Sequence, residues 1–409
     1  MSYTVTQEDV RLLLQQSKKL SVTFELLNQN MQIIDELQGD IISGDYSEDS
    51  TSDIRKTLNV TFYVRNKSYY INENSNIWMD KTVRVKLGIL NNRTGKIVQY
   101  NLGLFIFSDY NFNYDSTNNT LTLPCIDLMG NFTGLRKGKL DGLKTVIDTK
   151  KGRNIRDVMI STITQLGGIK NYLIDNIGSE YPHNLNPETN TYPEQIPYDL
   201  EFSTGSTIYD ILVKLRDLYP GYQMYFDVDG TFICTRIPTA INDIAILDDT
   251  TLSSLIISEA QSGSFNNIKN CIQVFGKDNS YWTIKLVNAI PSVQTEKTTY
   301  KVNPESPYTI EKIGEVWEVF SGGEYEKIYT EQLLKDRCAY ELWNATNRTI
   351  ALTLESILIP FLNVYQKIKY TLKSSKETYQ FITNKISFNL TDGKMSIGLN
   401  RFYPLYEWM

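Results

Sequence analysis

The only histidine in the chain, His183, is the first residue to consider for catalysis. A Ser-His-Asp or Cys-His arrangement would have to use this side chain, but it lies in a Pro- and Asn-rich stretch, residues 178–197, without a nucleophile turn nearby. The sequence also has no GxxxxGKS/T motif and no GxGxxG motif after a predicted strand. These patterns predict neither a histidine-dependent hydrolase nor a nucleotide-dependent enzyme.

Two groups of carboxylates have residue types suited to metal binding or acid–base chemistry. Asp227-Val228-Asp229-Gly230 begins like a calcium loop, but residues 231–234 add no carboxylate and alternate like a strand, so we expect a hairpin turn. Asp248 and Asp249 could serve glycoside hydrolysis in principle. Because they precede a predicted strand, residues 251–260, we interpret them as solvated turn residues.

Tryptophans and cysteines are the remaining residue types that could bind a sugar or a metal. Trp317, Trp343 and Trp408 could line a sugar-binding groove, although core or interface packing explains Trp343 more simply, and Trp282 alternates with apolar neighbours like a residue packed in a sheet. The four cysteines are far apart and form no CxxC pair, which predicts buried free thiols: Cys125, Cys234, Cys271 and Cys338. We therefore predict no catalytic residues, no metal and no cofactor, and the sequence assigns no residues to an assembly interface.

Composition favours a folded β-rich protein of several domains. The 409 residues are 41% hydrophobic and 22% charged, which predicts two to four domains with sizeable cores. The 27 tyrosines stand among Val, Ile and Thr, as is typical of strands. A net charge of −6 without a basic patch argues against tight nucleic-acid binding. The N-terminus lacks a secretory signal pattern and the chain has no 18-residue apolar stretch, so we expect a cytoplasmic protein without stable membrane insertion.

The N-terminal part predicts a capped helix followed by many strands. Thr6 and Asp9 have the spacing of a capping box, before an apolar face of Val10, Leu13 and Leu14. A hairpin follows around residues 28–30, and four apolar runs predict strands: residues 58–65, 82–90, 97–114 and 121–130. The acidic, polar stretch from Asp45 to Asp53 has nothing to pack, so we expect a mobile loop there.

The middle part mixes helices with a hairpin. An apolar stripe predicts a helix in residues 154–168, and a second helix begins after the predicted cap Ser206, with Asp210 near it. The C-terminal part returns to strands, interrupted by a helix at residues 331–345 that we expect to pack across a second β-barrel through Leu334, Cys338 and Leu342. Pro360 cannot donate to a ladder and limits the strand at residues 349–359.

The predicted fold is mainly β with an α+β middle: two tube-like β-barrel domains plus a mixed α+β domain. The predicted boundaries are 1–136 for the N-terminal barrel, 137–245 for the mixed domain, and 246–409 for the C-terminal barrel with its packed helix 331–345.

Three segments carry a resemblance to a known family. Residues 203–238 contain a capped amphipathic helix and a D-x-DG hairpin ending in Pro, and residues 337–343 form an Arg-, Ala-, Tyr- and Leu-rich helix before the strand LTLESILIP at 352–360. The third segment is FITNKISFNLTDGKMSIGLNRFYP at 381–404. Together they resemble the baseplate hub, or tail-tip, proteins of tailed bacteriophages and phage-like particles. The chain departs from the family at Asn363, where Asp is common, and in residues 178–197.

The resemblance implies a structural protein without enzymatic activity. It implies a homotrimer in which each copy carries two tube-like barrels, so that a ring joins a six-fold tail tube to a three-fold tip and lines the channel. Its partners would be a tail tube or distal tail protein, a tape-measure protein and tail spikes or fibres, while DNA would pass without specific binding. The protein would assemble in the bacterial cytoplasm and reside in the virion at the tail tip.

Two alternatives remain open. A tail-associated cell-wall hydrolase would carry a catalytic domain, for which residues after the second β region leave little room. A receptor- or carbohydrate-binding protein of the tail tip would fit the Tyr and Trp content, but would not need an N-terminal helix followed by a tube-like β region.

Overall fold

The computed structural model describes residues 3–401 with internal gaps at 38–39, 65–70, 73–74, 115–118, 143, 148–152, 179–194, 197–198, 220, 238–243, 264, 324, 329 and 347–349. His183, Trp408 and most of the 178–197 stretch therefore lie outside the described residues. Within the described part, no helix is both long and apolar enough to cross a membrane.

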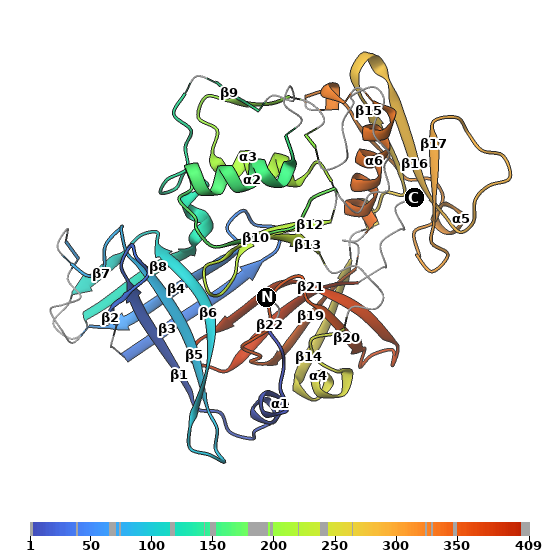
Figure 1. The fold of residues 1–409 in the computed structure, drawn as a ribbon. Helices are drawn as coiled ribbons and strands as arrows, with labels where there is room; N and C mark the ends of the chain where they lie inside the picture. The colour runs from blue at the N-terminus through green and yellow to red at the C-terminus, as the bar shows by residue number, and fades with distance from the viewer. Residues whose placement is uncertain are drawn as a thin grey trace.

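A large antiparallel sheet takes strands from both ends of the chain (Figure 1). In the described part its order is β14-β19-β22-β21-β3-β4-β8-β6-β5-β1-β2, with β20 on β21 and β7 on β8. Its N-terminal strands are β1 (Leu20–Leu27), β2 (Ile33–Glu36), β3 (Asp40–Asp49), β4 (Lys56–Tyr63), β5 (Thr82–Leu90), β6 (Ile97–Phe107), β7 (Asn111–Tyr114) and β8 (Asn119–Asp127). Its C-terminal strands are β14 (Ile256–Gly263), β19 (Ile350–Ile357), β20 (Lys367–Thr371), β21 (Thr378–Asn389) and β22 (Lys394–Arg401).

This topology confirms a mainly β protein and differs from two separate closed barrels. The strand order is open, because no pairing among the described residues joins β2 to β14 or closes either half. Instead β3 pairs with β21, so the sheet continues from one half into the other, and one hydrophobic core contains buried residues of both halves. The predicted domain boundaries remain a prediction.

Strand β3 corrects the expectation of a mobile loop at residues 45–53. Tyr46 and Glu48 are buried, and the Tyr46 ring stacks on Phe388 of β21 with centroids 4.6 Å apart. The stretch looked like a loop because its alternate residues are polar and face solvent. Its partners β4 and β21 hold it in the sheet, and β21 is more than 300 residues away in sequence.

The helix α1 (Gln7–Leu13) begins with the predicted capping box. The Asp9 amide donates to the Thr6 hydroxyl at 3.2 Å, and the Asp9 carboxylate accepts from the Thr6 amide at 2.8 Å. The buried apolar residues are Leu12 and Leu13, whereas Leu14 is 51% exposed, so the predicted apolar face was wrong by one position.

A second core lies in the mixed unit, drawn in green in Figure 1. Its elements are η2 (Leu128–Asn131), β9 (Lys144–Ile147), α2 (Ile155–Ser161), the π-helix η3 (Thr162–Leu166), β10 (Tyr172–Ile174), β11 (Leu200–Ser203), α3 (Ile208–Arg216), β12 (Tyr222–Phe226) and β13 (Phe232–Arg236). The N-cap of α3 is Thr207, one residue after the predicted Ser206, and Asp210 completes a capping box with it.

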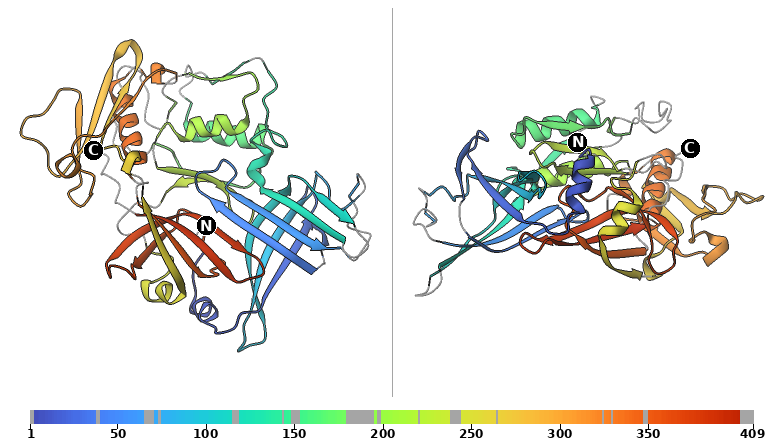
Figure 2. Two further views of the ribbon diagram at one scale, coloured as in Figure 1. Left: turned by 180° about the vertical axis from the view of Figure 1, so that it is seen from behind. Right: turned by 90° about the horizontal axis from the view of Figure 1, so that it is seen from below.

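A third core holds helix α6 (Glu331–Thr346) against a four-stranded sheet. This sheet has the order β17-β16-β15-β18, from β15 (Cys271–Phe275), β16 (Tyr281–Val287), β17 (Thr298–Val302) and β18 (Trp317–Phe320). The short helices η4 (Phe265–Asn267), η5 (Lys277–Asn279), α5 (Ile310–Ile313) and η6 (Tyr325–Lys327) occur in the same segment. In Figure 2 this unit, in gold and orange, projects from the body of the molecule.

Helix α6 therefore does not pack across the C-terminal strands of the large sheet, as the sequence led us to expect. Its predicted face is right: Leu334, Cys338 and Leu342 are buried, but in the core with β15 and β16. The Cys338 thiol donates to the Trp282 carbonyl at 3.2 Å, which ties the helix to β16. All four cysteines are buried free thiols, as predicted.

The helix α4 (Asp249–Leu255) and strand β14 replace the strand predicted at residues 251–260. Asp248 is the N-cap of α4, and Asp249 accepts from the Thr371 amide of β20 at 2.7 Å, so neither is a free turn carboxylate. Next to them, Glu259 of β14 accepts from the amides of Lys373 and Ser374 at 2.9 and 2.8 Å. Asp249 and Glu259 thus satisfy backbone donors at the end of β20 and in the turn after it, on the side where β20 has no strand in the described part.

Candidate interdomain pocket

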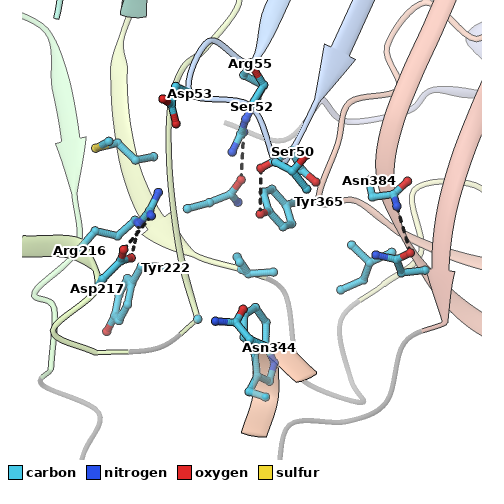
Figure 3. Close-up of a pocket in the computed structure, with 18 of the residues that line it drawn as sticks. Ser50, Ser52, Asp53, Arg55, Arg216, Asp217, Tyr222, Asn344, Tyr365 and Asn384 are labelled. Atoms are coloured by element: carbon cyan, nitrogen blue, oxygen red, sulfur yellow. Dashed lines mark hydrogen bonds and ion pairs between the residues drawn. The ribbon is translucent and has the colours of Figure 1, made fainter. Parts of the chain in front are cut away.

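A cavity of about 490 Å³ lies where four parts of the chain meet (Figure 3). The turn between β3 and β4, the mixed unit, helix α6 and the C-terminal strands each contribute to its wall. Cavities of this size commonly bind small molecules. The pocket is therefore the candidate site for which the structure gives a geometry.

Arg55 anchors the first wall. Its side chain is only 7% exposed, and its guanidinium lies 4.2 Å from the Tyr225 ring centroid and 5.1 Å from the Tyr365 ring centroid. The guanidinium also donates to the Gln223 amide oxygen at 3.2 Å. Arg55 thus connects the β3–β4 turn to the mixed unit and to the C-terminal strands through stacking and one hydrogen bond.

An ion pair within the mixed unit forms the second wall. Arg216 donates to both carboxylate oxygens of Asp217 at 2.7 and 3.1 Å. Burial alone would lower the pKa of Arg216, but the Asp217 carboxylate outweighs burial and raises it. Beside this pair, burial raises the pKa of the Tyr209 hydroxyl and the negative charge of Asp53 raises it further. The Arg216 guanidinium therefore stays cationic near neutral pH, held in its ion pair with Asp217.

Helix α6 forms the third wall with a face distinct from its core face. Tyr340, Trp343 and Asn344 follow the i, i+3, i+4 spacing that places side chains together on a helix, and all three line the cavity. Asn344 is hydrogen-bonded to Tyr340. One turn earlier, Arg337 donates to the Asp217 carbonyl at 3.2 Å, so the same helix is tied directly to the mixed unit.

The C-terminal strands and the turn before β20 form the fourth wall. Tyr365 has φ 59°, a left-handed conformation that is strained for a residue with a Cβ. Its amide donates to the Thr383 carbonyl at 2.7 Å, and its hydroxyl lies 3.4 Å from the Ser50 carbonyl. Asn384 donates to Asn400 at 3.0 Å across β21 and β22 (Figure 3). These contacts hold a backbone geometry that the local sequence alone disfavours.

The pocket contains no recognisable catalytic arrangement among the described residues. Its best-defined cations and anions are paired with protein groups, and no group of three or more His, Cys, Asp or Glu side chains in the described part of the chain could hold a metal. What remains is a surface of tyrosine, tryptophan, hydroxyl and amide groups. Such a surface is suited to ligand binding.

The structure places the residues singled out from the sequence at separate points. Asp227 accepts from the amides of Asp229 and Thr231 at 3.0 and 2.8 Å, which confirms the hairpin turn. Trp343 lines the pocket, whereas Trp317 lies 42% exposed on β18 and Trp282 is buried in the third core. The tryptophans therefore do not form one groove within the described residues.

The sequence analysis did not identify Arg55, Asp217, Asn344 or Tyr365 as pocket residues. The one usable signal was the second stripe on helix α6, which carries Tyr340, Trp343 and Asn344 beside the apolar stripe of the core. The other walls come from segments far apart in the chain, so no spacing in the sequence could bring them together.

Comparisons with known proteins give matches mainly at the level of structure. A domain of unknown function, DUF5048, matches residues 305–406. No curated protein sequence matches the chain. Among solved structures, a tail protein from Neisseria meningitidis is 11% identical with a TM-score of 0.58, over 95% of this chain and 98% of its own.

Two further solved structures match over similar lengths. A 43 kDa prophage tail protein from Shewanella oneidensis is 11% identical with a TM-score of 0.60, over 94% of this chain and 99% of its own. A prophage tail protein from Listeria monocytogenes is 12% identical with a TM-score of 0.53, over 92% and 94% of the two chains. At these identities the similarity shows a fold shared with phage tail proteins, and at that level it confirms the resemblance.

Proposed function

We propose that this chain, which shares its fold with solved phage tail proteins, is a structural protein of the tail of a phage or phage-like particle. The observation that carries the proposal is the match over nearly the whole length of three tail proteins from different bacteria. A whole-length match includes all three cores of the chain in their relative order, and not one widespread β-domain. The protein would reside in the virion at the tail tip after assembly in the host cytoplasm.

The finer proposal is a baseplate hub that forms a ring of three copies around a channel. Each copy would supply the two halves of the large sheet as two segments of the ring wall, so that six such halves meet a six-fold tail tube. Two exposed edge strands support association between copies: β2 and β14 end the large sheet, and most of their residues are exposed. Unpaired strand edges are ready partners for another chain.

The proposed partners follow from this position. A tail tube or distal tail protein would bind one face of the ring, spikes or fibres the other, and the tape-measure protein would end near the channel. The net charge of −6 would let DNA pass without specific binding. We propose no enzymatic activity, and release of fragments from peptidoglycan by the purified protein would support the hydrolase alternative instead.

Light scattering coupled to size-exclusion chromatography tests the ring. We expect trimers of the 47.1 kDa chain, or trimers formed on adding the tail tube or distal tail protein encoded beside it. Ile34→Lys in β2 and Ile257→Lys in β14, at side chains 40% and 55% exposed, should reduce assembly without unfolding the monomer. Val293→Lys is the matched control, because Val293 is exposed but lies outside both edge strands. A chain that stays monomeric with its partners present contradicts the proposal.

A further inference from the structure

The pocket described above leaves open space between polar and aromatic side chains, and an assembly role alone does not explain that space. Side chains that only join domains are normally packed against each other without space between them. Here about 490 Å³ remains open between Trp343 and Tyr340 on one side and the β3–β4 turn on the other. Thr51, Ser52 and Asp53 are exposed at this turn, so part of the wall faces solvent.

The arrangement of charges argues against an anionic ligand and against a metal ion. Asp217 already binds Arg216, and the guanidinium of Arg55 is stacked between two tyrosine rings and bonded to Gln223. A phosphate or carboxylate ligand would need cations that are not already compensated, and a metal would need clustered carboxylates. Neither condition is met by the described residues of the wall.

The uncharged part of the wall combines aromatic surfaces with groups that donate and accept hydrogen bonds. Trp343 and Tyr340 offer ring surfaces, while Asn344 and Asn400 line the same cavity with amide groups and Ser52 with a hydroxyl. Amides and hydroxyls suit a ligand that carries many hydroxyls of its own. Aromatic rings suit a ligand that also has an apolar face.

We propose that this pocket binds an uncharged saccharide of one or two rings. The sugar would lie against Trp343 with its hydroxyls on Asn344 and the facing amide and hydroxyl groups, and would enter beside the β3–β4 turn. The strained backbone of Tyr365 supports a binding role, because such conformations persist where the surrounding structure fixes a site. This site is independent of the ring, since it lies within a single copy of the chain.

Saturation-transfer difference NMR with the full chain tests the proposal. Four sugars are each tested at about 10 mM: N-acetylglucosamine, glucose, galactose and rhamnose. At this concentration a sugar with a Kd of about 1 mM occupies most of the sites. We expect transfer to at least one of them. Trp343→Ala should weaken binding about tenfold, since ring contacts contribute at about that level. Asn344→Ala should weaken it severalfold through the lost hydrogen bonds.

The control is Trp317→Ala, which removes an exposed tryptophan of the separate four-stranded sheet and should leave binding unchanged. Trp343 is outside the core that fixes α6, so Trp343→Ala should leave the fold intact. If Trp343→Ala does unfold the chain, Asn344→Ala still tests the pocket. Absence of transfer from all four sugars overturns the proposal. It is also overturned if transfer is unaffected by both pocket substitutions.

Discussion

Truncation of Arg55 is the sharpest test of how the parts of this chain are held together. The side chain is buried and connects the β3–β4 turn to Tyr225 and Gln223 of the mixed unit and to Tyr365. A charged hydrogen bond contributes about 1.5–3 kcal/mol, and each stacked ring about 0.5–2 kcal/mol. Arg55→Ala frees roughly 2 kcal/mol of side-chain entropy, so we expect a net loss of about 3 kcal/mol.

Urea unfolding followed by tyrosine and tryptophan fluorescence measures this loss. Arg55→Lys should lose about half as much, because lysine keeps the charge but not the planar stacking surface. Arg93→Ala is the matched control, since Arg93 lies exposed in the turn between β5 and β6. We also expect the mixed unit to unfold in a separate transition in Arg55→Ala. A loss below about 1 kcal/mol in a single transition would refute the reasoning that Arg55 couples the units.

Three further predictions concern single side chains. Burial alone would raise the pKa of Asp9, but hydrogen bonds from Thr6, Tyr100 and Tyr3 outweigh it and lower that pKa. Asp9 should therefore stabilise the fold above its unfolded pKa and lose that contribution as pH falls through the folded pKa, a dependence that Asp9→Asn should flatten in acid-unfolding curves. Glu259→Ala should cost about 1 kcal/mol in urea unfolding, because the part-buried Tyr370 hydroxyl and two amides lose their acceptor. Glu355→Ala, at an exposed position of β19, should cost little. Gly138→Ala should lower the thermal midpoint strongly, because φ is 90° and a Cβ would lie 2.5 Å from the Phe132 carbonyl oxygen. Gly142→Ala is the control and should leave the midpoint unchanged, because a Cβ there meets no atom within 4 Å. Equal midpoints for the two variants would contradict the strain argument.

Local patterns in the sequence predicted those elements whose sequence signal is itself local. The capping box at Thr6, the alternation in the strand at residues 82–90 and the apolar stripe of the helix at 331–345 are each visible within one short segment. The hairpin at Asp229-Gly230 is equally local, because the Asp227 carboxylate accepts hydrogen bonds from two backbone amides of the same turn. Such elements can be read from composition and spacing alone.

The errors occur where distant partners decide the structure. Residues 45–49 form a strand through pairing with β21, and α4 is held beside β20 by Asp249, which accepts from the distant Thr371 amide. Helix α6 was predicted with the right face but the wrong partner, because a stripe of Leu334, Cys338 and Leu342 does not specify which sheet it covers. The pocket was missed for the same reason: four segments with no common spacing build it.

The pairing of β3 with β21 has a consequence for synthesis on the ribosome. The two strands are separated by about 340 residues, so at ~5–20 residues per second the partner of β3 emerges roughly 20–70 s later. During that interval the first strands can pair with each other, but the edge of β3 that later pairs with β21 stays unpaired and can associate with other chains. Completion of the central sheet therefore requires synthesis of β21, and a chain interrupted before residue 378 should be prone to aggregation and bound by chaperones.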